Sequence, residues 1–242
     1  MTRILLLGGT TEANLLAQAI AKAGLSAVYS YAGRTEAPMG QPIHMRVGGF
    51  GGVEGLCAYL QTEGITHVID ATHPFAAQMS GNAVAACTAT GTPLIALERA
   101  PWTAGEGDRW THVPDLAAAV AALDGPPQRV FLAIGRQHID AFAAQPQHRY
   151  LLRLVDQPTG PLPFAADVIV ARGPFDVAGD TDLLQKHRIQ VIVAKNAGGK
   201  GAVAKIAAAR ALGLPVVMID RPSIPPRRVA HGVAGVMAWL SA

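Results

Sequence analysis

The chain has few charged residues and few cysteines, and both scarcities exclude classes of protein. Charged residues make up only 15 % of the 242 residues, and Lys plus Arg exceed Asp plus Glu by just 20 to 17. This balance forms no dense basic stripe of the kind that a nucleic-acid backbone requires, so we expect no nucleic-acid partner. Two cysteines, Cys57 and Cys87, are too few for a disulfide framework and indicate a reducing compartment.

Long apolar runs are also missing. Glycine, proline or charged residues interrupt every hydrophobic stretch before it reaches the roughly 20 residues that span a bilayer. Near the N-terminus, the run Ile4–Leu7 is too short for the core of a signal peptide and leads directly into glycines. We therefore expect a soluble, cytoplasmic protein with no membrane partner.

What the chain does have is a regular alternation of short Val/Ile/Leu runs with Ala-rich stretches of helical period, which is typical of parallel sheets covered on both faces. The expected strands are 3–7, 27–31, 45–47, 67–70, 94–97, 110–113, 130–134, 150–155, 168–171, 191–194 and 216–219. The expected helices are 12–23, 53–63, 76–90, 115–123 and 233–240, with another containing Lys205 and Arg210.

The alternation breaks between Glu98 and Trp110, where the sequence becomes polar and rich in glycine. A boundary there gives two Rossmann-like α/β domains with mainly parallel sheets and an inter-domain cleft. Residues 1–100 are expected to form the first domain, and residues 101–242 the second. The last helix is expected to pack on either half.

The first strand leads through Gly8-Gly9-Thr10-Thr11-Glu12 into a helix. Such a turn aims backbone N–H groups and the positive end of the helix dipole at an anion, and glycine lets the backbone approach a pyrophosphate. The full G-x-G-x-x-G fingerprint is absent, so a capped structural turn remains the alternative. We expect the coenzyme phosphates at Gly9, Thr10, Thr11 and Glu12.

Two later segments at the same sheet edge extend this expected coenzyme site. Gly33-Arg34-Thr35 follows the second strand, where a guanidinium suits the additional phosphate of NADP, although an arginine in a surface loop is common. Gly49-Phe50-Gly51 follows the third strand, where the missing side chains allow close approach to the backbone, with a flexible turn as the alternative.

The fourth strand ends in Asp70-Ala71-Thr72-His73-Pro74-Phe75. Thr72 is expected beside the coenzyme, and His73 and Phe75 beside the substrate. An imidazole can deliver a proton near neutral pH, as reduction of a conjugated double bond requires, so His73 is the candidate proton donor or substrate orienter. A lone histidine is nevertheless often only a loop or capping residue.

Basic residues follow strands of the second half. The segment Lys195-Asn196-Ala197-Gly198-Gly199-Lys200 lacks the glycine spacing and the Ser or Thr of a nucleotide P-loop. Its lysines are instead candidates for binding substrate carboxylates, with solvated loop charges as the alternative. The candidates of this kind are Arg172, Lys195, Lys200 and Arg221. Residues 1–100 are thus expected to be an NADP-binding domain, and residues 101–242 a second α/β domain that contributes to substrate binding.

Other catalytic signatures are absent. No tyrosine is followed by lysine four positions later, no Cys or His cluster has zinc spacing, and no Gly-x-Ser-x-Gly elbow occurs. We expect no metal site. Hydride chemistry remains, in which a nicotinamide coenzyme performs the difficult step.

Six segments of the chain carry a family signature: Leu5-Leu6-Leu7-Gly8-Gly9-Thr10-Thr11-Glu12-Ala13, Asp70-Ala71-Thr72-His73-Pro74-Phe75-Ala76, Glu98-Arg99-Ala100-Pro101-Trp102, Lys195-Asn196-Ala197-Gly198-Gly199, Ala204-Lys205 and Arg221-Pro222. Together they resemble the precorrin-6A reductase family over nearly the whole chain. The resemblance implies hydride transfer from NADPH to a double bond of precorrin-6A, a tetrapyrrole with many carboxylates, to give precorrin-6B in cobalamin biosynthesis. It also allows hand-over of the tetrapyrrole to neighbouring pathway enzymes.

Three alternatives stay open at this point. A non-catalytic regulator that senses NADPH would use the same fold, and a reductase or epimerase of another carbonyl or enone compound would use the same coenzyme. The third is a reductase of the cobalt-containing precorrin, although we favour the metal-free substrate.

Overall fold

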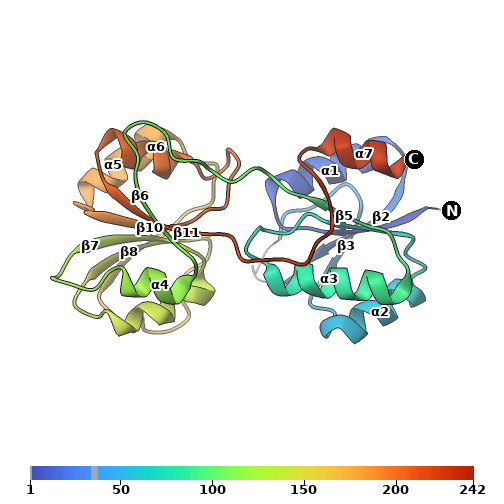
Figure 1. Ribbon diagram of the computed structural model, residues 1–242, viewed down its shortest axis with the longest axis horizontal. Helices are drawn as coiled ribbons and strands as arrows, with labels where there is room; N and C mark the ends of the chain where they lie inside the picture. The colour runs from blue at the N-terminus through green and yellow to red at the C-terminus, as the bar shows by residue number, and fades with distance from the viewer. Residues whose placement is uncertain (1, 34–37) are drawn as a thin grey trace. The chain divides into compact units, whose positions relative to one another are not determined.

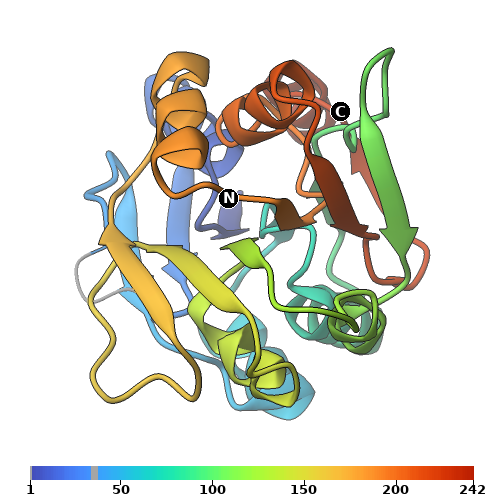
Figure 2. The same cartoon turned by 90° about the vertical axis from the view of Figure 1, so that its left-hand side faces the viewer.

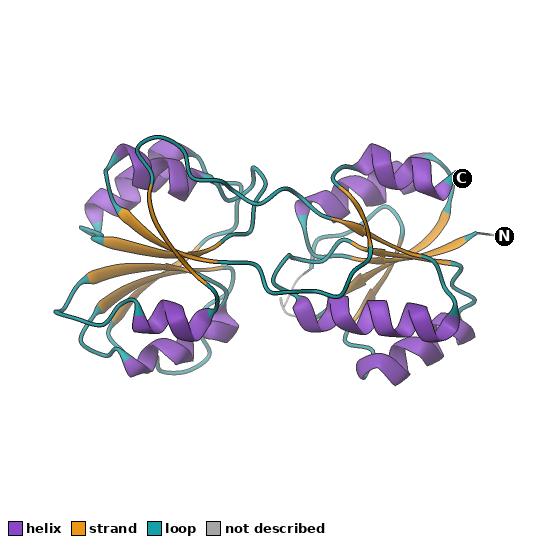
Figure 3. Ribbon diagram, in the orientation of Figure 1, coloured by secondary structure: helices purple, strands orange, loops and turns teal. Residues whose placement is uncertain are grey.

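The computed structural model describes residues 2–33 and 38–242, and the chain divides into two compact units. The first unit comprises Met1–Ala100 together with Ser223–Ala242, and the second comprises Pro101–Pro222. Each unit has its own six-stranded sheet with helices on both faces (Figure 1, Figure 3). The α/β fold expected from the sequence is confirmed, but the expected second domain of 101–242 is too long, because its last segment returns to the first unit.

The first sheet has the strand order β12-β5-β4-β1-β2-β3, and all its neighbouring strands are parallel. The order reverses between β1 and β4, which makes their carboxyl ends a topological switch point, the usual place for a ligand in open α/β sheets. The elements of this unit are β1 (Arg3–Leu7), α1 (Thr11–Lys22), β2 (Ser26–Tyr31), β3 (His44–Val47), α2 (Gly52–Thr62), β4 (His67–Asp70), α3 (Ala77–Thr90), β5 (Leu94–Leu97), β12 (Arg228–Ala230) and α7 (Val233–Leu240).

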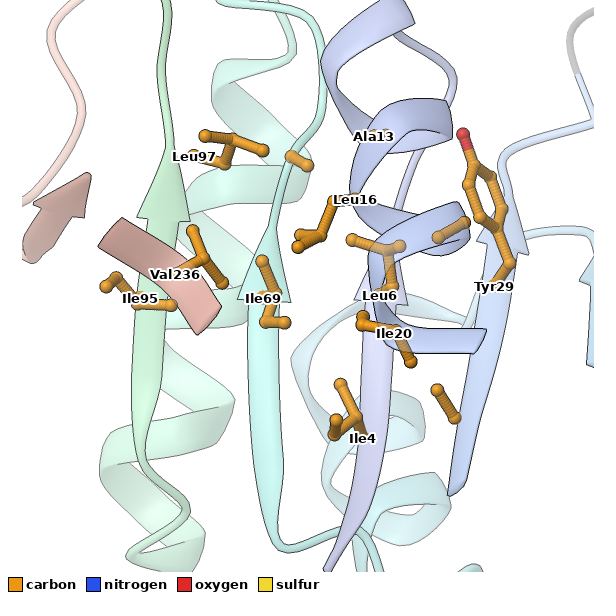
Figure 4. Close-up of a cluster of buried hydrophobic side chains, with 13 residues drawn as sticks. Ile4, Leu6, Ala13, Leu16, Ile20, Tyr29, Ile69, Ile95, Leu97 and Val236 are labelled. Atoms are coloured by element: carbon orange, nitrogen blue, oxygen red, sulfur yellow. The ribbon is translucent and has the colours of Figure 1, made fainter. Parts of the chain in front are cut away.

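Alternation along β1 explains the two layers of helices on this sheet. Ile4 and Leu6 face α1 and α7, while Leu5 and Leu7 face α2 and α3, and all four side chains are buried. Val236 of α7 is fully buried in the cluster with Ile4 and Leu6 (Figure 4). Burial of this side chain and pairing of β12 with β5 hold the C-terminal segment on the first unit.

The second sheet has the strand order β6-β11-β10-β7-β8-β9, again with parallel neighbours (Figure 2). Starting from β7, its order repeats that of the first sheet, and the outer strand β6 comes from the beginning of the unit. The elements are β6 (Arg109–Val113), α4 (Leu116–Ala121), β7 (Arg129–Ala133), the 3-10 helix η1 (Arg136–Ala144), β8 (Arg149–Leu154), β9 (Ala166–Val170), α5 (Val177–Lys186), β10 (Val191–Lys195), α6 (Ala204–Ala211) and β11 (Pro215–Ile219).

Neither unit contains a membrane-crossing helix in the part of the chain that the structure describes, because no helix there is long and apolar enough.

The core of the first unit should weaken at alkaline pH through Cys87. Burial, followed by the nearby Cys57 and Asp70, raises the pKa of the Cys87 thiol from 9.0 to about 12. The folded state therefore keeps this thiol protonated after the unfolded chain ionises. Its contribution to stability is complete below pH ~9 and is lost as the pH rises toward ~12, by at most about 1.4 kcal/mol per pH unit.

We expect a Cys87→Ala variant to lose stability with pH more slowly than the wild type. The measurement is urea unfolding between pH 8 and pH ~11. Because the comparison is of slopes, the cavity left by the smaller side chain does not affect it. Identical slopes in the two proteins would show that the thiol ionises equally in both states.

Candidate active site

The turn after β1 is built around a buried tyrosine. A Cβ added to Gly8 would lie 2.2 Å from ring atoms of Tyr29, so only glycine fits there. Gly9 adopts a φ of +107°, which also favours glycine, and its N–H donates to the Tyr29 hydroxyl at 2.9 Å. That hydroxyl donates in turn to Asn14 Oδ1 at 2.7 Å, and in Figure 4 it points toward the N-terminal end of α1.

Thr10 is the N-cap of α1. Its hydroxyl accepts from the backbone N–H of Ala13 at 3.1 Å and donates its single hydrogen to the carbonyl of Ala71 at 2.8 Å. The side chain is thus used to cap the helix and to fix the turn to the segment after β4. The amides of Thr11 and Glu12 precede the first intrahelical hydrogen bond, so they remain as donors to an anion at this end of the helix.

The carboxylate of Glu12 faces an arginine that the sequence analysis did not select. Glu12 Oε2 accepts from Arg99 Nη1 at 2.6 Å, and both side chains are about three-quarters or more buried. Arg99 thus neutralises the Glu12 carboxylate at the start of α1. Arg99 follows β5, far along the chain from Glu12, and no local pattern connects the two.

The segments after β2 and β3 carry further expected coenzyme residues. Gly33 has a φ of +75° and lies near Gly48 of the glycine-rich loop. Arg34 and Thr35 lie outside the described residues. Gly49 and Gly51 have nothing within 4 Å of an added Cβ, so the loop is open above them. Gly51 is the N-cap of α2 and provides no side-chain cap.

The segment after β4 is ordered by Asp70. The buried Asp70 Oδ1 accepts from the Thr72 backbone N–H at 3.1 Å and from the Thr72 hydroxyl at 2.6 Å. His73 follows, and its Nδ1 accepts from the backbone N–H of Phe75 at 3.2 Å. This contact assigns the proton of a neutral His73 ring to Nε2, which makes Nε2 the donor. The rings of His73 and Phe75 are 5.8 Å apart.

Behind this segment lies a charged cluster that sequence reasoning missed. Arg227, from the C-terminal segment, contacts Glu98 Oε1 through Nη2, and its Nε is 3.8 Å from Asp70 Oδ2. The Asp70 Oδ2 and Arg227 Nε atoms are buried without a hydrogen-bond partner in the described part of the chain. A cavity of about 10 Å³ lined by these residues and His73 has room for one water molecule to bridge them.

In the second unit, one aromatic side chain, Trp102, and one basic side chain, Arg221, hold the loop after β10. The Trp102 backbone N–H donates to Asn196 Oδ1 at 2.8 Å, and Trp102 Nε1 donates to the Gly199 carbonyl at 2.8 Å. Arg221 donates from Nε to the Asn196 carbonyl at 3.0 Å and from Nη2 to the Ala197 carbonyl at 3.1 Å. Two of the Arg221 donors are therefore used to hold the loop in place.

The other basic candidates lie along the carboxyl edge of the same sheet. Arg172 follows β9 and is exposed, Lys195 ends β10, and Lys200 is exposed at the tip of the loop. Because β8 and β7 lie between β9 and β10, the strand ends that carry Arg172 and Lys195 are about 14 Å apart. Such a spread suits a large ligand with several carboxylates better than a small monoanion.

Among residues 2–33 and 38–242, no three His, Cys, Asp or Glu side chains gather in a way that could hold a metal ion. The two sheet orders and the switch-point turn define a Rossmann-like α/β protein. Its sequence matches the family described as Precorrin-6x reductase CbiJ/CobK over residues 3–241. The chain belongs to this family.

Individual relatives agree with the family match. A precorrin-6A reductase of Rhodobacter capsulatus is 65 % identical over 242 residues, which cover 100 % of this chain and 96 % of the relative. A precorrin-6A reductase of Rhodococcus erythropolis is 46 % identical, with 99 % of this chain and 98 % of the relative covered. A solved structure, "CobK precorrin-6A reductase", has a TM-score of 0.97 at 65 % identity, with 100 % of this chain and 96 % of that chain covered.

Proposed function

We propose that this protein is a precorrin-6A reductase, which transfers a hydride from NADPH to one carbon of a double bond of precorrin-6A while a proton reaches the other carbon. The products are precorrin-6B and NADP⁺, in the cobalamin pathway. The observation that carries the proposal is the 65 % identity to the Rhodobacter capsulatus precorrin-6A reductase along the entire chain. Residues of the switch-point turn are part of that matched length.

The coenzyme is proposed to lie along the carboxyl edge of the first sheet. Its diphosphate accepts from the backbone N–H groups at the start of α1, where the helix dipole favours negative charge. Because the Thr10 hydroxyl donates to Ala71, the backbone at Thr10, Thr11 and Glu12 supplies the donors rather than the Thr10 side chain. Thr72, ordered by Asp70, borders the same edge.

The substrate is proposed to be held through its carboxylates by Arg172, Lys195 and Lys200, which spread along one sheet edge. Arg221 then acts by holding the 196–197 backbone in place, since two of its donors are bonded there. Phe75, beside His73, offers an apolar surface to the macrocycle.

We favour the metal-free precorrin over the cobalt form. The relatives named precorrin-6A reductase match at 65 %, 49 % and 46 % identity. A relative named cobalt-precorrin-6A reductase, from Priestia megaterium, matches at 31 % over 91 % of this chain. The chain is therefore closer in sequence to the enzymes of the metal-free substrate.

His73 is proposed to orient the substrate through Nε2–H and, when Nδ1 is also protonated and no longer accepts from the Phe75 N–H, to supply the proton. We expect His73→Ala to lower the single-turnover rate of reduction by about 100-fold, the lower end of the usual contribution of one acid–base group. Binding of NADPH should change less than about 3-fold, because the diphosphate is bound at the start of α1. His73→Gln, which keeps a donor but does not titrate, separates the two roles: it should restore part of the rate if orientation dominates.

The measurement is the anaerobic decay of NADPH absorbance after rapid mixing with substrate. An unchanged rate in His73→Ala would remove this residue from the reaction. The control is Lys22→Ala at the end of α1, which should leave the rate unchanged. The neighbouring Pro74 is unsuitable because it shapes the same segment as His73.

The proposed function itself is tested by the same assay with metal-free and cobalt-containing precorrin-6A side by side. Turnover of the metal-free substrate with loss of one NADPH per macrocycle is the expected result. Turnover of the cobalt form alone would make the cobalt-containing precorrin the substrate in place of the metal-free one. Stoichiometric NADPH binding without turnover of either tetrapyrrole would favour the regulator that senses the coenzyme.

A further inference from the structure

A rigidly held arginine lies beside the end of β2. Arg46 is the third residue of β3 and pairs in register with Ser30, the last but one residue of β2. Its Nη1 donates to Ser30 Oγ at 2.7 Å and to the Gly48 carbonyl at 3.0 Å, and its Nη2 donates to the Gly49 carbonyl at 3.1 Å. The guanidinium carbon is 3.9 Å from the centroid of the Phe50 ring. These contacts fix the plane and the position of the charge.

The charge of Arg46 is not neutralised within the described residues. None of the carboxylates there lies within 4.0 Å of its guanidinium, and its three acceptors are a hydroxyl and two carbonyls. Other arginines of the first unit differ, since Arg3 pairs with Glu63 and Arg99 pairs with Glu12. A guanidinium held in place without a carboxylate partner is available to a bound anion.

Space for such an anion lies next to Arg46. Added Cβ atoms at Gly48, Gly49, Gly51 and Gly52 meet nothing within 4 Å, so the loop that Arg46 holds is open. Three of the five guanidinium N–H groups are used in the contacts above, which leaves two for a ligand.

We propose that Arg46 binds the 2′-phosphate of NADPH and thereby sets the preference for NADPH over NADH. In a sheet of this strand order, the adenosine ribose of a dinucleotide lies at the end of β2, the strand to which Arg46 is hydrogen-bonded. A phosphate monoester can accept from two N–H groups of one guanidinium, and Arg46 keeps one N–H on Nε and one on Nη2. This inference rests on the proposed function and adds a specificity residue of β3 to the proposed coenzyme site.

The test compares Arg46→Gln and Arg46→Lys with wild type in two measurements. The first is calorimetric titration with adenosine 2′,5′-bisphosphate and with adenosine 5′-monophosphate, which differ only in the 2′-phosphate. The second is kcat/KM with NADPH and with NADH. For Arg46→Gln we expect weaker binding of the bisphosphate and a lower kcat/KM with NADPH, each by about 10- to 100-fold. The monophosphate and NADH should change less than about 3-fold.

Arg46→Lys keeps the charge but loses the paired N–H groups, so it should fall between wild type and Arg46→Gln. Arg3→Gln is the matched control, because Arg3 begins β1 at the amino ends of the strands, away from the proposed coenzyme site. It should leave both binding constants and both kcat/KM values unchanged. Equal losses of kcat/KM with NADPH and with NADH in both Arg46 variants would show that Arg46 only supports the loop, and would overturn the proposal. Unchanged kcat/KM with both coenzymes would overturn it as well.

The outcomes also separate this inference from the proposed function. If the wild type turns over precorrin-6A with NADPH while the Arg46 variants keep their selectivity, only the Arg46 assignment fails. If the wild type binds neither bisphosphate nor NADPH, the proposed coenzyme site fails and Arg46 with it.

Discussion

Gly8→Ala should destabilise the first unit by about 3 kcal/mol and abolish detectable coenzyme binding. The new Cβ would lie 2.2 Å from two ring carbons of Tyr29 and 2.4 Å from its hydroxyl oxygen. The ring has no free space into which it could retreat, because it is fully buried and its hydroxyl is bonded to Gly9 and Asn14. Relief of the clash must therefore move the turn or the start of α1, which are the groups proposed to bind the diphosphate.

Tryptophan fluorescence during urea unfolding measures this effect on the first unit if Trp102 and Trp110 are replaced by Phe, since Trp239 is then the only tryptophan. A second variant identifies the cause. Leucine at position 29 lacks the ring atoms that clash, so Gly8→Ala combined with Tyr29→Leu should cost less than the sum of the single changes. Strict additivity of the two changes, or a Gly8→Ala protein of normal stability, would contradict the steric explanation.

The fold was predictable where local patterns determine the structure. Strands 3–7, 67–70 and 94–97 and the helix 233–240 have the predicted bounds, because each is a hydrophobic run or an Ala-rich period ended by glycine, proline or a polar turn. The three-residue strand β12 was not predicted, and neither were α5 and the 3-10 helix η1. β12 forms because its backbone pairs with β5. The sequence Arg228-Val229-Ala230 does not predict this tertiary contact.

The same distinction holds for the candidate site. The glycine-rich turn, the Thr72-His73 segment and the glycine loop could be predicted as candidate site segments, because parallel strands bring their carboxyl ends to one edge. Arg46, Arg99 and Arg227 were missed, since each takes its role from a partner distant in sequence. A guanidinium in a loop or strand has no local signature, and only the folded chain shows which arginines are bonded and to what.

One ion pair of the second unit is almost completely withdrawn from water. The side chains of Arg153 and Asp180 are 9 % and 3 % exposed, and Nη1 contacts Oδ1 while Nη2 lies 3.4 Å from Oδ2. The guanidinium carbon also lies 3.6 Å from the centroid of the Phe175 ring. Removing one charge leaves the other in an apolar, desolvated position, whereas removing both leaves no unpaired group.

We therefore expect Asp180→Ala to destabilise the second unit by about 3 to 5 kcal/mol, and the paired change Arg153→Met with Asp180→Leu to stay within about 1 kcal/mol of the wild type. Trp102 and Trp110 lie in this unit, so fluorescence of a Trp239→Phe protein during urea unfolding reports on it alone. Arg149→Met is the matched control, because its pair with Asp167 lies at the surface, where solvent screens the charges and the pair contributes little. A similarly small effect of Asp180→Ala would mean that water reaches Arg153 once its partner is gone, and that desolvation does not govern this pair.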